Sequence, residues 1–307
     1  MSEIKKIAIS IGDINGIGMQ LALQNHYVIK HLCSPIYCID QKILKSASKI
    51  LGIAIPEDFN ISGKYDKCGI KPAKVSKESG KFSYDSFMQA INLAKENEVD
   101  SICTLPINKE SWKKAGINYV GHTDMLRDIF KKDAIMMLGC SKMFVALYTE
   151  HIPLKEVPKY IKKSKLIKFL KEFYIDIGEP NEKIAVLGLN PHAGDNGVIG
   201  DEEFKIIKAI KEVNKSLQNN IFELVVPDIA FTPRSREKYK YFVAMYHDQG
   251  LSALKALYFD ESINVSLNLP IIRTSVDHGT AFDIAYKKNN NISNLSYINA
   301  IKEAVGL

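Results

Sequence analysis

Histidines stand at or just past the ends of four apolar runs in this sequence. The runs are VALYTEH, IAVLGLNPH, YFVAMYH and IIRTSVDH, and they lead to His151, His192, His247 and His278. A short apolar run bounded by turn residues is typical of a strand buried inside a parallel sheet. Open α/β sheets bind their ligands at the carboxyl ends of such strands. The repetition therefore predicts that several of these histidines serve one site.

His151, His192 and His247 are the strongest candidates for metal ligands, because each follows a long apolar run. Three imidazoles suit Zn²⁺ or a similar divalent transition ion, and they leave coordination positions for a substrate atom. None of them has H-x-x-x-H spacing, so only the fold can assemble such a site. Asp248, which follows His247, could orient a ligand histidine through a hydrogen bond or act as a base. The sequence leaves both roles open.

A second group of residues has the chemistry to bind an anion. Arg273 ends the apolar run LNLPIIR and is one of four arginines in the chain. A guanidinium buried there would pair with a carboxylate or phosphate of a ligand, or with an aspartate of the protein. His122 and Thr123 open a predicted helix in GHTDML, where their donors favour an anion, although such residues also serve as simple caps. Lys255 and Asn264 complete the group.

Together these groups predict a divalent-metal enzyme that acts on a small anionic substrate. Alcohol oxidation, hydrolysis and decarboxylation all fit such a site. The chain has no Walker A motif, no G-x-S-x-G and no H-E-x-x-H. The glycines of GDINGIG, at positions 12, 16 and 18, do not follow G-x-G-x-x-G. A tight turn that places Asp13 and Asn15 at a strand end is therefore favoured over a Rossmann dinucleotide site.

Composition narrows the class of protein further. The chain has 307 residues, of which 46% are hydrophobic and 25% charged, as in soluble globular proteins with one or two domains. The net charge of +6 comes from lysines scattered among acids, so solvated helix faces are favoured over nucleic-acid binding. No apolar run approaches the ~18 residues of a membrane span, and no secretory signal opens the sequence. Five cysteines without C-x-x-C spacing fit a reducing cytoplasm.

Strand and helix patterns alternate along the chain. Apolar runs predict strands at residues 4–11, 35–39, 99–105, 135–138, 144–149, 184–190, 223–226 and 242–246. Helical periodicity occupies most of the intervals, including residues 83–97, whereas residues 52–80 are rich in Gly, Pro, Lys and Ser and are expected to be irregular. This alternation predicts an α/β protein with largely parallel strands.

Seven sequence blocks between residues 12 and 281 occur in the order of a known family. They read GDINGIG, PINK, GHTD, TEHIPLKEV, GLNPHAGDNGVIG, MYHDQGL and NVSLNLPIIRTSVDHGTA. On these blocks the chain resembles the 4-hydroxythreonine-4-phosphate dehydrogenases (PdxA family) of pyridoxal phosphate, or vitamin B6, biosynthesis. Where this family usually has GDPAGIGPE, the chain has GDINGIGMQ, so Asn15 departs from the family pattern.

The resemblance implies a fold and an assembly. We expect two α/β/α domains with a cleft between them, similar to isocitrate and isopropylmalate dehydrogenases. The first domain is expected at residues 1–125 plus 288–307. The second, with most of the metal and substrate residues, is expected at residues 126–287. The resemblance also implies a homodimer whose active site lies at the subunit interface.

The resemblance further implies residue roles and a reaction. His151, His192 and His247 match the family's metal ligands, with Zn, Co, Mg or Mn as the metal. The family's substrate contacts match five residues: His122, Thr123, Lys255, Asn264 and Arg273. NAD or NADP would accept hydride as 4-phosphohydroxy-L-threonine becomes 2-amino-3-oxo-4-phosphobutanoate, which would lose CO₂ to give 3-amino-2-oxopropyl phosphate. The alternatives are a related dehydrogenase of another phosphorylated hydroxy acid and a non-catalytic phospho-ligand binding protein.

Overall fold

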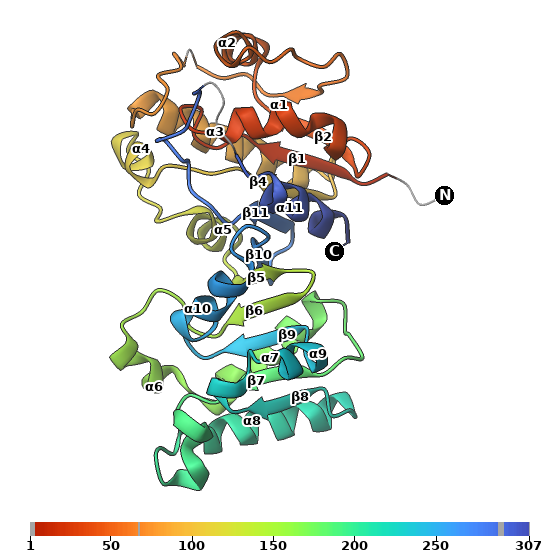
Figure 1. Ribbon diagram of the computed structural model, residues 1–307, viewed down its shortest axis with the longest axis vertical. Helices are drawn as coiled ribbons and strands as arrows, with labels where there is room; N and C mark the ends of the chain where they lie inside the picture. Colours follow the sequence, from red (N-terminus) through yellow and green to blue (C-terminus); the bar gives the residue numbers. More distant parts are fainter. Residues whose placement is uncertain (1–3, 67, 288–291, 307) are drawn as a thin grey trace. The chain divides into compact units, whose positions relative to one another are not determined.

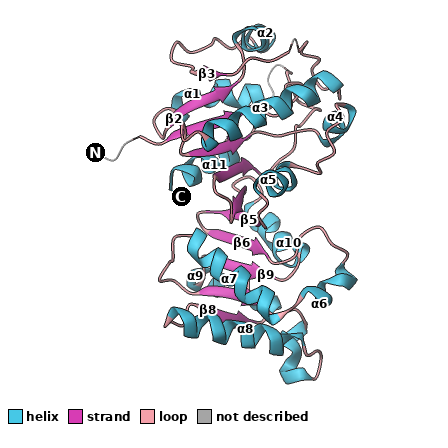
Figure 2. Cartoon of the chain, turned by 180° about the vertical axis from the view of Figure 1, so that it is seen from behind, coloured by secondary structure: helices cyan, strands magenta, loops and turns pink. Residues whose placement is uncertain are grey.

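The computed structural model describes residues 4–66, 68–287 and 292–306, and its elements are labelled in Figure 1. By their contacts these residues form two compact units. Unit 1 contains the described residues of Met1–Lys132, Ile263–Val265 and Leu269–Leu307, and unit 2 contains Asp133–Ser262 and Ser266–Asn268. In each unit, helices pack beside the strands of a sheet (Figure 2).

Unit 1 is built on parallel strands in the order β3-β2-β1-β4-β11. Its elements are β1 (Lys6–Ser10), α1 (Gly18–Ile29), β2 (Ser34–Cys38), α2 (Gln41–Leu51), β3 (Ile61–Ser62), α3 (Lys77–Lys95), β4 (Ser101–Thr104), α4 (Lys109–Lys114), α5 (His122–Phe130), β11 (Ile272–Val276) and α11 (Leu295–Gly306). A further strand, β10 (Ile263–Leu267), contributes residues to both units.

Helices cover both faces of the unit 1 sheet. Successive residues of a strand face opposite sides, and β4 shows the two sides directly. Ile102 belongs to a buried cluster with Phe87 and Ile91 of α3. The neighbouring Ser101 donates a hydrogen bond of 3.2 Å to the carbonyl of Ala304 on α11. The sheet therefore lies between α3 and α11.

Helix α3 begins earlier than its sequence predicts. It starts at Lys77 rather than at residue 83, after Ser76, whose Oγ accepts a 3.0 Å hydrogen bond from the N–H of Ser79. Gly80 falls in the stretch expected to be irregular, yet it lies inside the helix. A Cβ at this position would lie 2.0 Å from the carbonyl oxygen of Ser111. The glycine therefore permits the close approach of α3 and α4.

Unit 2 has the strand order β5-β6-β9-β7-β8, with an antiparallel β5–β6 pair and parallel pairs for the rest of its described ladder. Its strands and α-helices are β5 (Ile135–Cys140), β6 (Met143–Leu147), α6 (Val157–Tyr160), α7 (Lys163–Asp176), β7 (Ile184–Leu187), α8 (Glu202–Leu217), β8 (Phe222–Val225), α9 (Pro233–Lys238), β9 (Tyr241–Ala244) and α10 (His247–Tyr258). Short 3₁₀ turns occupy Leu154–Glu156, Pro191–Gly197 and Pro227–Ile229.

The unit 2 sheet also has a helix on each face. Gly250 of α10 packs so closely on the sheet that a Cβ there would lie 2.4 Å from Cγ1 of Val145. On the opposite face, the ring of Tyr241 meets Phe173 of α7 edge-on, at a centroid distance of 6.2 Å. Each unit is therefore an α/β/α sandwich around its own core.

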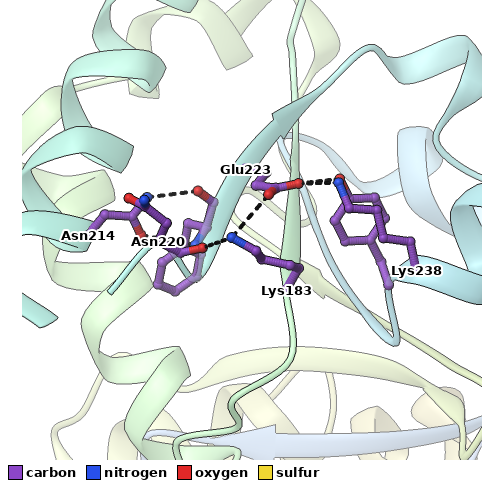
Figure 3. A network of polar contacts seen from close by, with 7 residues as sticks. Lys183, Asn214, Asn220, Glu223 and Lys238 are labelled. Atoms are coloured by element: carbon purple, nitrogen blue, oxygen red, sulfur yellow. Dashed lines mark hydrogen bonds and ion pairs between the residues drawn. The ribbon is translucent and has the colours of Figure 1, made fainter. Parts of the chain in front are cut away.

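Polar contacts around Glu223 tie the edge strand β8 to its neighbours (Figure 3). Its Oε2 accepts hydrogen bonds from Lys238 Nζ at 2.5 Å and from the Tyr239 hydroxyl at 2.6 Å, while its Oε1 lies 3.2 Å from Lys183 Nζ. Partial burial by itself would raise the pKa of Glu223, but these contacts outweigh it and lower the pKa to about 2. The edge of the sheet is thus stabilised by a carboxylate that stays charged in mild acid.

The structure confirms the predicted α/β class. By their contacts, residues 126–132, 263–265 and 269–287 group with unit 1, although the expected ranges place them in the second domain. For residues 269–287 the physical reason is that β11 pairs in parallel with β4, which places Arg273 opposite Ile102. Asn264 also lies in unit 1, whereas Lys255 lies in unit 2. No helix in the described part of the chain is long and apolar enough to cross a membrane.

Candidate functional site

Arg273 is a buried cation at the centre of a cluster in unit 1. It is 2% exposed, and its Nε and Nη2 donate to the Thr104 hydroxyl at 3.2 and 2.8 Å. Its Nη2 also lies 3.2 Å from Nδ1 of His122. Burial lowers the pKa of Arg273 to about 10, so the guanidinium remains charged at neutral pH. A buried positive charge held by a hydroxyl and an imidazole suits an anionic ligand.

His122, the first residue of α5, is held in one tautomer by Arg273. Burial, and then the charge of Arg273, lower the pKa of His122 well below its ordinary value, so the ring is neutral. A guanidinium can only donate, so Nδ1 must accept and the proton must sit on Nε2. The Nε2 atom is buried and has no hydrogen-bond partner among the described residues. His122 therefore presents a buried N–H donor close to the guanidinium.

Aromatic rings fix the orientation of this imidazole. The His122 ring lies edge-on to Phe87 of α3 at 4.5 Å and to Trp112 of α4 at 5.7 Å, both between ring centroids. Neither ring is among the residues that the sequence motifs mark as candidates. The tryptophan is the only one in the chain, but no spacing along the sequence relates it to the GHTD block.

The other candidate substrate residues are placed less directly. Thr123 is the second residue of α5 and is 7% exposed, and Gly121, which precedes the helix, provides no side-chain cap. Asn264 has a buried Oδ1 with no hydrogen-bond partner in the described part of the chain. Lys255 lies on α10, with its Nζ 5.4 Å from the ring centroid of Phe259. The structure thus shows direct contact between Arg273 and His122, and Thr123 follows His122 in the chain.

The GDINGIG block forms the tight turn that its sequence predicts after β1. Gly12 has a φ of +72°, and a Cβ there would lie 2.2 Å from the Pro106 carbonyl oxygen, so glycine is required. Asp13 is fully buried and accepts from the N–H of Asn15 at 3.0 Å and the Ser79 hydroxyl at 3.2 Å. Burial raises the pKa of Asp13 although these hydrogen bonds oppose the shift. The side chain of Asn15 accepts from the Lys71 N–H at 2.8 Å, so this block anchors a neighbouring loop.

His151 and His247 form a pair in unit 2. Their ring centroids are 5.4 Å apart. Two imidazoles bound by ~2.1 Å bonds to one tetrahedral ion would have centroids about 5 Å apart, so the spacing fits a shared metal. Nδ1 of His247 lies 2.7 Å from Oδ1 of Asp248. In the neutral ring this contact keeps the proton on Nδ1 and leaves the lone pair of Nε2 for a metal.

His192 lies in an unusual turn after β7. Five successive residues from His192 to Asn196 have φ values of 52°, 52°, 77°, 42° and 55°, a left-handed run that costs roughly 1–2 kcal/mol per non-glycine residue. In the described part of the chain, no three His, Cys, Asp or Glu side chains form a group that could hold a metal ion. Among the described residues, His192 is therefore not grouped with the His151–His247 pair.

Thr104 ends β4, His122 begins α5, and His151 and His247 follow β6 and β9. The carboxyl ends of strands and the starts of helices are the places where α/β proteins bind small ligands. Comparison with known proteins defines the family. The model of the family described as pyridoxal phosphate biosynthetic protein PdxA matches residues 31–304. The chain belongs to this family.

Individual relatives agree across the whole length. The chain is 58% identical to the 4-hydroxythreonine-4-phosphate dehydrogenase of Sulfurimonas denitrificans, over 100% of the chain and 99% of the relative. It is 55% identical to the enzyme of the same name from Campylobacter fetus, over 99% of each. The crystal structure of 4-hydroxythreonine-4-phosphate dehydrogenase from Klebsiella pneumoniae matches with a TM-score of 0.81 and 31% identity, over 98% of this chain and 97% of that one.

Proposed function

We propose that the chain is an NAD- or NADP-dependent 4-hydroxythreonine-4-phosphate dehydrogenase. It would oxidise 4-phosphohydroxy-L-threonine to 2-amino-3-oxo-4-phosphobutanoate, and loss of CO₂ would give 3-amino-2-oxopropyl phosphate. Membership of the PdxA family and the names of relatives at 58% and 55% identity support this assignment. The structural observation that carries it is the contact of buried Arg273 with half-buried His122, which suits an anionic substrate.

Arg273 and His122 are proposed to bind the phosphate of the substrate. The guanidinium supplies charge, and the Nε2–H of His122 supplies a donor that burial keeps neutral. Thr123 lies at the N-terminus of α5, where exposed backbone N–H groups favour an anion. Lys255 and Asn264 are proposed as further substrate contacts, in agreement with the motifs they occupy. Desolvation would make each of these contacts stronger than it is in water.

His151, His192 and His247 are proposed to hold a divalent ion, which would be Zn, Co, Mg or Mn. The donor set fits, since two of the imidazoles already lie at the spacing of a shared ion. When bound, the metal supplies Lewis-acid polarisation of the C3 hydroxyl, and the nicotinamide accepts hydride. Asp248 keeps the proton of His247 on Nδ1. That contact favours an orienting role for Asp248 over that of a base.

A homodimer whose active site lies at the subunit interface is also proposed, in agreement with the family motifs that the chain carries. The five cysteines form no disulfide, and we propose that the enzyme works in the cytoplasm.

The assignment is tested with purified, chelator-treated protein. The assay contains 4-phosphohydroxy-L-threonine, NAD or NADP and one of Zn²⁺, Co²⁺, Mg²⁺ or Mn²⁺, and it follows absorbance of the reduced cofactor. We expect metal-dependent reduction that fails with the unphosphorylated amino acid. No reduction with any of the four ions would reject the proposed activity. Faster turnover of a different phosphorylated hydroxy acid would redirect the substrate assignment.

A further inference from the structure

The three strands that lead to the candidate metal histidines are neighbours in unit 2. β9 pairs in parallel with β6 on one side and with β7 on the other. The carboxyl ends of these strands therefore lie at one edge of the sheet, in the order β6, β9, β7. His151, His247 and His192 follow these strands in the same order. Beyond the strand ends the regular ladder stops, so other groups must fix the spacing of the three segments.

A hydroxyl joins the first two segments. Thr149 lies two residues before His151, and its Oγ1 donates to the carbonyl of Met245 at 2.6 Å. Met245 lies two residues before His247. Thr149 is 6% exposed and Met245 is fully buried, so water does not compete for this bond. The distance between the His151 and His247 segments is thus set by a buried contact outside the ladder.

An amide joins the second segment to the third. The Oε1 of Gln249 accepts from the N–H of Met245 at 2.7 Å, and its Nε2 donates to the carbonyl of Gly188 at 2.6 Å. A backbone N–H and a carbonyl are unambiguous partners, so they fix which end of the amide faces which strand. Met245 follows β9 and Gly188 follows β7. Gln249 therefore spans the gap between the strand ends that lead to His247 and His192.

A buried carboxylate holds the chain that follows Gly188. Glu203 is 3% exposed, and its Oε1 accepts from the N–H groups of Leu189 and Asn190, both at 2.7 Å. Its Oε2 accepts from the side-chain amide of Asn190 at 2.9 Å. These bonds fix the start of the left-handed turn that carries His192. A backbone this strained persists only where its surroundings over-determine it.

We propose that Thr149, Gln249 and Glu203 are positioning residues that set the spacing of the three histidine segments. We call them the strand-end network. The inference rests on the proposed metal role of His151, His192 and His247. Thr149 fixes the His151–His247 pair, whereas Gln249 and Glu203 fix the turn that presents His192. Ligands held before the ion arrives lose less entropy on binding it, so the network raises metal affinity without touching the ion.

The test measures Co²⁺ affinity of the full-length protein after chelator treatment. Competition with a chromophoric chelator gives the Kd, and the visible absorption of bound Co²⁺ reports its coordination. We expect Thr149→Val and Gln249→Met to raise the Kd by about 10–100-fold, the usual effect of removing a partner that orients metal ligands. We also expect an altered Co²⁺ spectrum, with parent-like circular dichroism.

Matched variants separate positioning from a general loss of stability. Thr149→Ser keeps the hydroxyl and is expected to retain the parent Kd. Thr232→Val also removes a bond from a threonine hydroxyl to a carbonyl, here the exposed 2.9 Å bond to Ile229, outside the strand-end network. It is expected to leave the Kd unchanged. Glu203→Gln keeps an acceptor for the backbone N–H groups and should weaken binding less than Glu203→Ala.

The outcomes distinguish this inference from the proposed function. Parent-like Kd values and spectra for both Thr149→Val and Gln249→Met would overturn the strand-end network while leaving the metal site in place. Equal weakening in Thr232→Val would also overturn it, because the loss would then be general. A parent protein that binds no Co²⁺ would reject the metal assignment itself, and the network inference with it.

Discussion

The Arg273–His122 cluster of unit 1 and the His151–His247 pair of unit 2 differ in how deeply they are buried. Arg273 is 2% exposed, and its contacts with Thr104 and His122 are already made. The side chains of His247 and Asp248 are 37% and 82% exposed. A permanent charge must be built into the core with its partners, because an unsatisfied buried charge is costly. A neutral imidazole carries no charge whose burial is costly, so it can remain partly exposed until an ion and a further ligand bind.

This difference in burial predicts different kinds of mutational damage. Changes in the Arg273–His122 cluster should lower substrate affinity and folding stability together, because the same contacts also stabilise the core. Changes in the histidine pair should affect metal and turnover while the fold is kept.

The largest loss of turnover is expected in the His151–His247 pair. His247→Ala removes a proposed metal ligand, and we expect turnover to fall by on the order of 10³-fold, equivalent to about 4 kcal/mol of transition-state stabilisation. Metal content is measured together with kcat and thermal unfolding. His31→Ala, at an exposed histidine outside both groups, is the control. Full turnover in His247→Ala would show that the ligand assignment is wrong.

A smaller effect is expected at the buried cation. Arg273→Lys keeps the charge but loses the planar fork, and a charge-assisted hydrogen bond is worth about 1.5–3 kcal/mol. We therefore expect KM for the phosphorylated substrate to rise by roughly 10–100-fold, with a smaller change in kcat. Steady-state kinetics measure both, and Arg234→Lys on the exposed face of α9 is the control. An unchanged KM would leave Arg273 as a structural residue.

The neutral state of His122 has a consequence for stability against pH. Because its pKa is well below 6.5 in the folded protein, the unfolded chain takes up a proton that the folded chain does not. Stability should then fall as pH drops below 6.5, by up to about 1.4 kcal/mol per pH unit from this residue. In urea unfolding, His122→Gln should show a flatter dependence than the parent between pH 6.5 and about 5.5. Identical slopes would mean that His122 is not held neutral.

The smallest effect is expected at the edge of unit 2, away from both groups. Glu223 has a pKa lowered to about 2, so its contacts contribute stability above pH 4.5 and lose it as pH falls towards 2. Glu223→Gln should reduce the free energy of unfolding at pH 7 by under ~1 kcal/mol, since the carboxylate is partly solvated. The difference from the parent should shrink near pH 3, with kcat unchanged at pH 7. Glu237→Gln, on the exposed face of α9, is the control.

Much of the fold could be predicted because its signals are local. Apolar runs predicted β1, β2, β4 and the strands of unit 2. The start of α3, by contrast, was predicted six residues too late, and the cause is non-local. Gly80 interrupts the helical pattern, yet it is tolerated because the backbone of α4 passes directly over it. The pairing of β11 with β4 groups residues 269–287 with unit 1, and no local pattern encodes this pairing.

The candidate site divides in the same way. The residue types marked Arg273, His122 and the three metal-site histidines as candidates. Gln249 stands two residues after His247, but the sequence does not show what it contacts. Glu203 gave no signal, since a glutamate in the first turn of a helix usually serves the helix dipole. Its burial and its bonds to Leu189 and Asn190 are visible only in the folded unit.

The sequence by itself determined the α/β class, the family blocks and the inventory of imidazoles, guanidinium and amides. These follow from short-range periodicity and from motifs that survive without a structure. The tertiary structure decided which of these groups meet. It placed Arg273 against His122, closed His151 on His247, left His192 outside that pair and joined the three strand ends through Thr149, Gln249 and Glu203. These contacts depend on strand pairing between distant segments. Hydrogen bonds at strand ends produce no periodic pattern in the sequence, so they cannot be predicted from it.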